Sequence, residues 1–128
     1  MIKIYRIALI IWTLIVLTLL IMPAKAFYHP LRFLTFHHAD KLIHFCLFGM
    51  LTFLMYKSLP KIIIKRKQLT IIISISAFGF LTECIQGLMY NTSQRSFSIY
   101  DWLFDTLAAI FIIAFLFVYE KLTNSTDY

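Results

Sequence analysis

Charged side chains are scarce in this chain of 128 residues, because Lys, Arg, Asp and Glu together make up only 14% of it. A soluble domain is usually about 25% charged. The sequence therefore has too little polar surface to coat a water-soluble globule of this size. Three glycines and three prolines are dispersed without a Gly/Ser linker, an internal repeat or a low-complexity tract, so a single domain over residues 1–128 is sufficient.

Cysteine is also rare, and its pattern carries little information. Cys46 and Cys84 form no C-x-x-C motif and lie within apolar segments, so we interpret them as small buried residues that do not indicate a redox compartment. The chain is rich instead in apolar side chains, with 61% hydrophobic residues and a mean hydropathy of +0.83. This composition indicates an integral membrane protein.

Four apolar segments predict helices over residues 4–22, 41–58, 69–90 and 100–120. At about 1.5 Å per helical residue, the first, third and fourth can cross a hydrocarbon layer about 30 Å thick. The second segment is short. It crosses the membrane only if the aliphatic parts of the Lys41 and Lys57 side chains extend along the helix ends. We therefore expect an all-α membrane protein, a bundle of about four transmembrane helices.

The distribution of Lys and Arg predicts the orientation of these helices. With four spans, eight of the twelve basic residues fall on one side: Lys3, Arg6, Lys57, Lys61, Lys65, Arg66, Lys67 and Lys121. That side is expected to be cytoplasmic, with both the N- and the C-terminus inside. The net charge of +6 then reflects topology and attraction to anionic lipids, and no separate basic domain favours nucleic acid as a partner.

The first segment has a second interpretation as a signal peptide. Lys3 and Arg6 precede an apolar core followed by Ala24-Lys25-Ala26, which has the A-x-A form of a signal-peptidase site. Cleavage there would leave three helices. We favour retention, because the remainder would still be a membrane protein with no soluble domain to export.

Polar residues gather near the outer boundary that this topology predicts. They are Asp40, His44, Glu83, Gln86, Arg95, Asp101 and Asp105. Within each predicted helix they are three or four residues apart, so each pair shares one helix face. Gly79 and Gly87 lie four residues before and after Glu83, which gives that face the small residues that close helix packing needs. We therefore expect the acids to point into the bundle.

Structural interpretations compete for several of these positions. Asp40 can be the N-cap of its helix, and Ser98 with Asp101 matches the capping-box pattern. His44 alone is more often a satisfied interior histidine than a catalyst. Arg95 alone is more often a solvated loop charge.

Two carboxylates keep a functional interpretation. A carboxylate inside a membrane is by default a candidate functional residue, which applies to Glu83 and to Asp105, one turn inside the last predicted helix. Together with His44 they are the candidate acid/base residues. The guanidinium of Arg95 would match a phosphate or carboxylate bidentately.

A metal site is the alternative chemistry for the same region. His37, His38, Asp40 and His44 offer nitrogen and oxygen ligands beside further carboxylates, a set that suits Zn²⁺ or Mn²⁺. The chain has no H-E-x-x-H motif, and six residues separate His38 from His44 across a helix start. We therefore expect no bound metal and no cofactor.

Three ordered motifs, D-K-x-x-H, E-x-x-Q and R-x-x-S-x-x-D, lie within residues 40–114, in "DKLIHFCLFGMLTFL", "FGFLTECIQGLM" and "QRSFSIYDWLFDTLAAI". With this set the chain resembles the VanZ-like family of small bacterial membrane proteins, whose eponymous member is associated with resistance to the glycopeptide antibiotic teicoplanin. The resemblance implies a multi-pass protein of the bacterial cytoplasmic (inner) membrane. Its recurring polar positions correspond to Asp40, Lys41, His44, Glu83, Gln86, Arg95, Ser98 and Asp101.

The chain departs from that family where the family usually has Asn and then Gly, since this sequence has Asp105 and Ala108. An ionised aspartate only accepts hydrogen bonds, whereas asparagine also donates them. The resemblance implies an outward-facing site that binds or modifies an envelope lipid, a lipid-linked precursor or a glycopeptide-type ligand. The expected ligand-binding residues are Arg95, Lys41, Gln86, Asp101, Asp40 and Ser98.

Three other functions are compatible with the same residues. A non-enzymatic membrane scaffold would use a buried ionic network to fix the packing of its helices. A small proton-coupled exporter is less favoured, because the acids lie near one face of the membrane and there is no inverted repeat. An intramembrane hydrolase would use the same Glu, His and Arg, but no pattern in the chain specifies that chemistry.

Overall fold

The computed structural model describes residues 1–22, 39–60, 66–93 and 96–124. Four long helices cover Ile2–Ile21 (α1), Ala39–Ser58 (α2), Lys67–Leu88 (α3) and Ile99–Asn124 (α5), and a short helix covers Tyr90–Ser93 (α4). Those ranges contain no strand, so the expected all-α class is confirmed. Each long helix begins one or two residues before the start predicted from its apolar segment, because hydropathy marks the apolar stretch and not the helix end.

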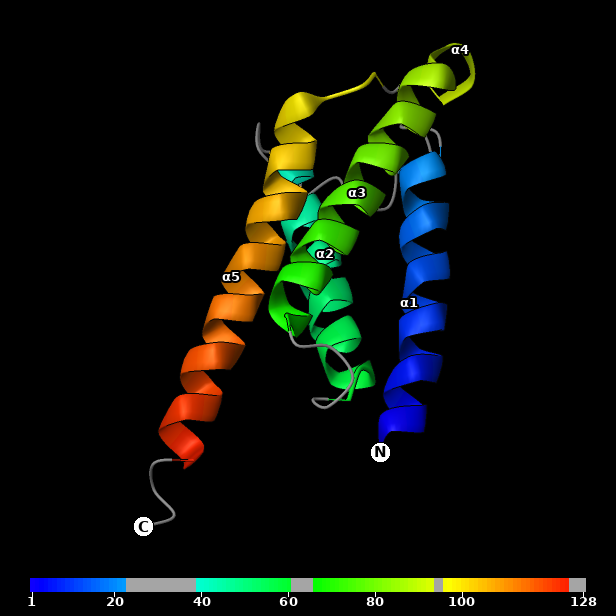
Figure 1. Ribbon diagram of the computed structural model, residues 1–128. Coiled ribbons are helices and arrows are strands. Elements are labelled where there is room, and N and C mark those ends of the chain that lie inside the picture. Colours follow the sequence, from blue (N-terminus) through cyan, green and yellow to red (C-terminus); the bar gives the residue numbers. More distant parts are fainter. Residues whose placement is uncertain (23–38, 61–65, 94–95, 125–128) are drawn as a thin grey trace.

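The four long helices alternate in direction along the chain (Figure 1). In this view α1 begins and α5 ends at the lower end of the bundle, whereas α1 and α3 end, and α2 and α5 begin, at the upper end. α2 packs against each of the other three long helices and most extensively against α5. The upper end therefore brings together residues that are far apart in the sequence.

Three of these helices, α1, α3 and α5, are long and apolar enough to cross a membrane, by length and composition. Their outward faces keep large hydrophobic side chains exposed, among them Ile10, Phe80 and Phe115. Such surfaces are costly in water and favourable in lipid. The chain is thus a membrane protein with at least three helices that are able to span.

α2 is 20 residues long but lies outside that apolar group. Its composition is more polar because it contains Asp40, Lys41 and Lys57 near its ends and His44, Thr52 and Ser58, which are buried. The contacts of α2 with α1, α3 and α5 place these buried side chains inside the bundle. A polar residue that is buried against protein does not have to be solvated by lipid.

The core between the helices consists of aliphatic and aromatic side chains with small residues at the closest contacts. Phe48 of α2 and Ile71 of α3 are fully buried, as are Ala108 and Ala109 of α5. Small residues at these positions allow helix backbones to approach closely, which is how membrane helices obtain packing contacts.

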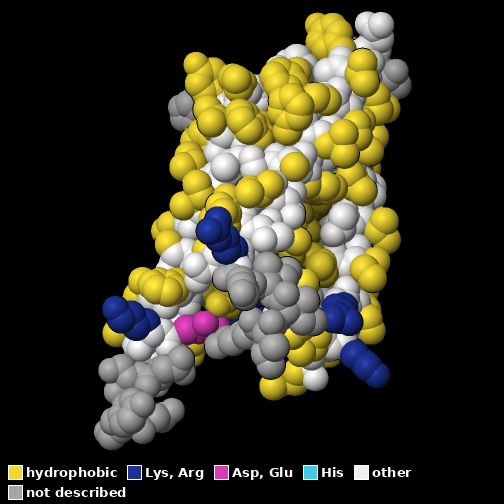
Figure 2. Space-filling view, in the orientation of Figure 1, with side chains coloured by type: hydrophobic (Ala, Val, Ile, Leu, Met, Phe, Trp, Pro, Cys, Tyr) yellow, Lys and Arg dark blue, Asp and Glu magenta, His cyan; other side chains and the backbone are white. Residues whose placement is uncertain are grey.

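Lys and Arg side chains on the face drawn in Figure 2 lie from mid-height to the lower end, and the upper part is mostly apolar. At the lower end Arg6 Nε donates to the carbonyl of Ser58 at 3.4 Å, and Lys67 Nζ donates to the carbonyl of Leu59 at 2.6 Å. Both carbonyls lie at the C-terminal end of α2, where cations complement the helix dipole. The basic residues therefore also stabilise a helix end.

Candidate functional site

His44 lies at the centre of the polar cluster at the upper end of the bundle. It projects from the second turn of α2 and is only 1% exposed. Its Nδ1 is 3.0 Å from Oδ1 of Asp105 on α5. The ring of Phe48, one turn further along α2, stacks parallel to the imidazole with centroids 6.2 Å apart. The aspartate and the aromatic ring together restrict the orientation of the imidazole.

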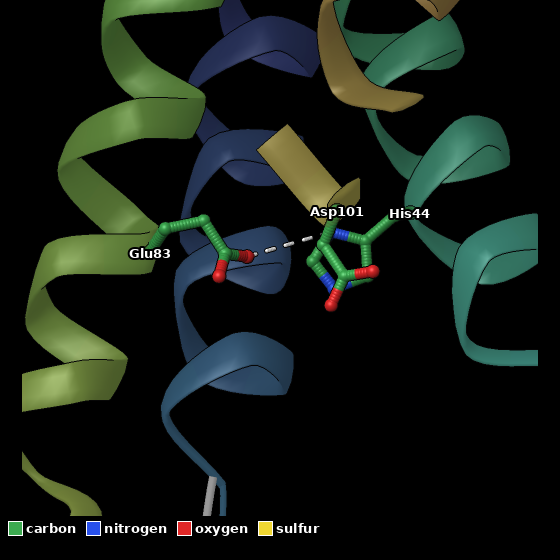
Figure 3. A group of neighbouring side chains, drawn as sticks. All are labelled: His44, Glu83 and Asp101. Atoms are coloured by element: carbon green, nitrogen blue, oxygen red, sulfur yellow. Dashed lines mark ion pairs between the residues drawn. The ribbon is translucent and has the colours of Figure 1, made fainter. Parts of the chain in front are cut away.

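Glu83 enters the cluster from α3, and its two carboxylate oxygens have different surroundings. Oε2 accepts a hydrogen bond of 2.9 Å from the backbone N–H of Ser98. Oε1 points toward His44 Nδ1 at 4.0 Å (Figure 3) and accepts no hydrogen bond from any residue that the structure describes. Oε2 therefore has a structural role at the start of α5, whereas Oε1 is buried and directed at the imidazole.

Ser98 and Asp101 form the start of α5 beside these groups. The carbonyl of Ser98 accepts from Trp102 N–H at 3.3 Å, and its Oγ accepts from Asp101 N–H, also at 3.3 Å. Ser98 is thus the N-cap of α5, as the capping-box pattern predicted. In a complete box the side chain at Asp101 would accept from Ser98 N–H, but here Glu83 of α3 accepts that hydrogen bond.

Two glycines of α3 allow the close approach that builds the cluster. A Cβ on Gly79 would lie 2.9 Å from Asp105 Oδ2, and a Cβ on Gly87 would lie 3.1 Å from Phe97 Cβ. Gly79 therefore makes room for Asp105 against α3. Gly87 makes room for Phe97, which places the next residue, Ser98, within hydrogen-bond reach of Glu83. The spacing of four residues predicted small residues on this face but not their partners.

The structure brings together five residues that the sequence singled out, namely His44, Glu83, Ser98, Asp101 and Asp105. His44, Glu83 and Asp105 are at most 1% exposed and Asp101 is 8% exposed, so the acids point into the bundle as expected. Figure 3 shows that Glu83, His44 and Asp101 approach one another from α3, α2 and α5. These three residues are far apart in the sequence and lie on three different helices. Packing of the helices is therefore what brings them together.

Two predicted ligand-binding residues have different neighbours. Gln86 Nε2 donates to the carbonyl of Leu20 at 2.9 Å, which satisfies one of the free carbonyls at the end of α1. Lys41 Nζ lies over the ring of Tyr100 at 5.4 Å and near that of Phe104 at 5.9 Å. Gln86 therefore joins α3 to α1, and Lys41 contacts the aromatic surface of α5.

The prediction that both cysteines are buried is wrong, because Cys46 is exposed and Cys84 is only partly buried. Several other predictions fall outside the described residues. Arg95 lies in the interval 94–95, and His37 and His38 lie in the interval 23–38, together with the signal-peptidase pattern at residues 24–26. Asp40 belongs to α2, but its side chain is outside what the structure describes. The roles predicted for these residues stay predictions.

Sequence reasoning missed two features of the interior. It did not identify Phe48 as the residue that stacks on His44, although the two are four residues apart and so share a helix face. It also missed the hydrogen bond of 3.0 Å from Tyr56 Oη to Glu120 Oε2 at the lower end. Glu120 interrupts the apolar run near the end of the last predicted helix, and that interruption was the available signal.

Chemically, the cluster combines one imidazole with three carboxylates in a place largely closed to water. It can exchange a proton between nitrogen and oxygen, accept hydrogen bonds from a polar ligand or provide oxygen and nitrogen ligands to a cation. Comparison of the chain with family models, with characterised proteins and with solved structures found no match. The function therefore has to be argued from the site itself.

Proposed function

We propose that this chain is a VanZ-like envelope protein whose polar cluster at the upper end of the bundle binds or modifies an envelope lipid or a glycopeptide-type ligand. The observation that carries this proposal is the convergence of Glu83, His44 and Asp105 from three helices, with Glu83 Oε1 left without a hydrogen bond among the described residues. A carboxylate in this position is expensive for a membrane protein. The presence of the Glu83 carboxylate at this position therefore favours a function in which a ligand contacts it.

The orientation is part of the proposal. Described Lys and Arg residues concentrate at the lower end, where α1 begins and α5 ends, and the sequence that joins α2 to α3 is basic. By the positive-inside rule this end faces the cytoplasm. The cluster then faces outward, toward lipid-linked precursors and glycopeptides, which occupy the outer side of the membrane. This orientation requires α2 to cross the membrane as the fourth span.

Binding can be tested with purified protein in nanodiscs, using a lipid-linked peptidoglycan precursor and teicoplanin as separate probes. Glu83→Gln keeps the shape of the side chain but removes its charge. A hydrogen bond to a charged group contributes about 1.5–3 kcal/mol, so we expect affinity for the true ligand to fall roughly 10-fold or more. The measurement is the dissociation constant of each probe for the wild-type protein and the variant.

Glu120→Gln is a matched control, because it makes the same chemical change at the opposite end of the bundle. It should leave the affinity unchanged. Arg95→Ala tests the sequence-based prediction of an anion clamp and is expected to weaken binding of a phosphorylated or carboxylated ligand. If Glu83→Gln and Arg95→Ala stay folded and both bind the two probes as the wild type does, the proposed function is wrong.

A non-enzymatic scaffold is the second candidate, and two hydrogen bonds support it. Ser98 N–H to Glu83 and Gln86 to the Leu20 carbonyl both link elements of the bundle without requiring a ligand. In that case Glu83→Gln and Gln86→Leu should lower stability by about 1 kcal/mol each, while neither probe binds the wild-type protein. Unfolding in a detergent titration, measured beside the binding assay, separates the two candidates.

A further inference from the structure

The most informative atom in the cluster is Glu83 Oε1. Glu83 is 0% exposed, and this oxygen accepts no hydrogen bond from the residues that the structure describes. The imidazole nitrogen that faces it, His44 Nδ1, is 4.0 Å away, which is too long for a hydrogen bond. The other oxygen of the same carboxylate is held by Ser98 N–H at 2.9 Å, so Oε1 is kept aimed into the cluster.

The atoms around Oε1 are those that a transition-metal cation prefers. His44, Glu83 and Asp101 can each contribute one nitrogen or oxygen atom, and these atoms lie within 4.8 Å of one another (Figure 3). The three residues come from three helices that pack together. One imidazole with carboxylates suits Zn²⁺ or Mn²⁺, in contrast to thiolate sites or the all-oxygen sites of Ca²⁺.

The geometry points to a divalent cation, Zn²⁺ or Mn²⁺, bound by His44, Glu83 and Asp101. Metal-to-ligand bonds of about 2.0–2.2 Å place neighbouring ligand atoms of one ion roughly 3 to 3.5 Å apart and opposite ones about 4 Å apart. The candidate ligand atoms of the three residues lie within 4.8 Å of one another, a little beyond that span. Small side-chain rotations would bring all three ligand atoms to bonding distance.

Surrounding contacts have the form of a supporting shell for such an ion. Asp105 Oδ1, 3.0 Å from His44 Nδ1, restricts the imidazole and would stay in place beside an ion bound at Nε2, and Ser98 N–H restricts the carboxylate of Glu83. Outer contacts of this kind orient metal ligands and raise affinity. The sequence led us to expect no bound metal; the set considered there included His37 and His38, which lie outside the described residues, whereas the described ligands that join His44 come from α3 and α5.

A bound cation would also explain how the proposed ligand is attracted to the cluster. This part of the inference rests on the proposed function, which supplies the chemical nature of the ligand. Carboxylates repel the phosphates of a lipid-linked precursor, but a divalent ion held by them can bridge to a phosphate oxygen. The ion would therefore supply the attraction that the acids alone lack. Binding of the ion itself is a separate property and can be measured without lipid.

The test uses the full chain, purified in detergent and freed of metal with a chelator, and titrates it with Zn²⁺ or Mn²⁺ alone. We expect one equivalent of ion to bind the wild type, measured by calorimetry and by metal analysis after dialysis. Glu83→Gln and Asp101→Asn should each weaken binding about 10-fold or more, since loss of supporting groups alone costs roughly 10–100-fold. The matched control, Glu120→Gln, should bind as the wild type does.

X-ray absorption spectroscopy of the wild-type protein loaded with Zn²⁺ or Mn²⁺ tests the inference even if the variants fail to fold. A first shell with one histidine nitrogen and carboxylate oxygens supports the site. A shell without histidine, or with sulfur from Cys46 or Cys84, overturns it. Failure of the folded wild type to retain either ion, or equal affinity in wild type and Glu83→Gln, also overturns it.

The proposed function and the proposed metal site can be contradicted independently of each other. Undiminished binding of the lipid-linked precursor or teicoplanin to metal-free protein would leave the proposed function intact and remove the role of the ion in it. Retention of the ion by His44, Glu83 and Asp101 with no binding of either probe would establish the metal site and contradict the proposed function.

Discussion

At the scale of single residues, Glu83 performs two tasks with one carboxylate. Oε2 accepts the Ser98 N–H and so fixes the start of α5, whereas Oε1 is directed at His44. A buried acid with both oxygens satisfied would be explained by packing alone. The difference between the two oxygens is what separates a structural from a functional interpretation of this residue.

Gly79 allows a direct prediction about this cluster. In Gly79→Ala the new Cβ would lie 2.9 Å from Asp105 Oδ2 and 3.2 Å from Asp105 Cβ. Asp105 cannot rotate away freely, because its other oxygen pairs with His44 at 3.0 Å. We expect a loss of about 1–3 kcal/mol in unfolding free energy from overpacking, together with weaker ligand binding, measured by detergent-induced unfolding.

Gly49→Ala is the matched control for that substitution. Gly49 is also buried in a helix, but its new Cβ would meet Ile112 Cγ1 at 3.6 Å, an ordinary contact. Alanine favours the helix over glycine by up to about 1 kcal/mol, so the variant should be as stable as the wild type or slightly more stable. Equal destabilisation by the two substitutions would show that close approach at Gly79 is not what shapes the cluster.

At the scale of elements, the start of α5 is stabilised by two helices at once. Ser98 Oγ caps the helix from its own sequence, and Glu83 of α3 accepts the N–H that a complete capping box would satisfy locally. A carboxylate at a helix N-terminus is also favoured by the helix dipole. The position of α5 relative to α3 therefore depends on one charged hydrogen bond.

Ser98→Ala removes the local part of this cap. The loss of the Oγ acceptor should lower stability by about 1 kcal/mol, while the backbone N–H of residue 98 still reaches Glu83. Ser96→Ala is the control, because Ser96 is exposed and precedes the helix. The prediction is contradicted if thermal unfolding in detergent gives the same midpoint for both variants.

At the scale of the whole molecule, the number of crossings decides where the chain begins and ends relative to the membrane. α1 begins and α5 ends at the same end of the bundle (Figure 1). If α2 spans as proposed, residues near both of these ends face the cytoplasm. If α2 does not span, three crossings would place them on opposite sides, which would require an arrangement of helices different from that in Figure 1.

Single-cysteine labelling tests the proposed topology. With Cys46 and Cys84 replaced by serine, we expect an impermeant maleimide to label Ser96→Cys in intact cells. Lys3→Cys and Thr123→Cys should react only after the membrane is opened, because both lie at the lower end. Labelling of only one of the latter two in intact cells would show three crossings, and labelling of both with protection of Ser96→Cys would show the opposite orientation.

The sequence by itself determined the membrane character, the four long helices and the inward direction of His44, Glu83 and Asp105. These properties follow from hydropathy, segment length and spacing along one helix, all of which are local. Local information also predicted Ser98 as a cap, since the residues of a capping box are neighbours in the chain.

Only the tertiary structure decided which partner each polar side chain meets. Gln86 contacts the end of α1, Lys41 lies over Tyr100, and Glu83 accepts the N–H of Ser98. Each of these contacts depends on how far one helix is displaced along another, which spacing within a single helix does not specify. A shift of one turn, about 5.4 Å, would give every one of these side chains a different neighbour, and the close contacts at Gly79 and Gly87 oppose that shift.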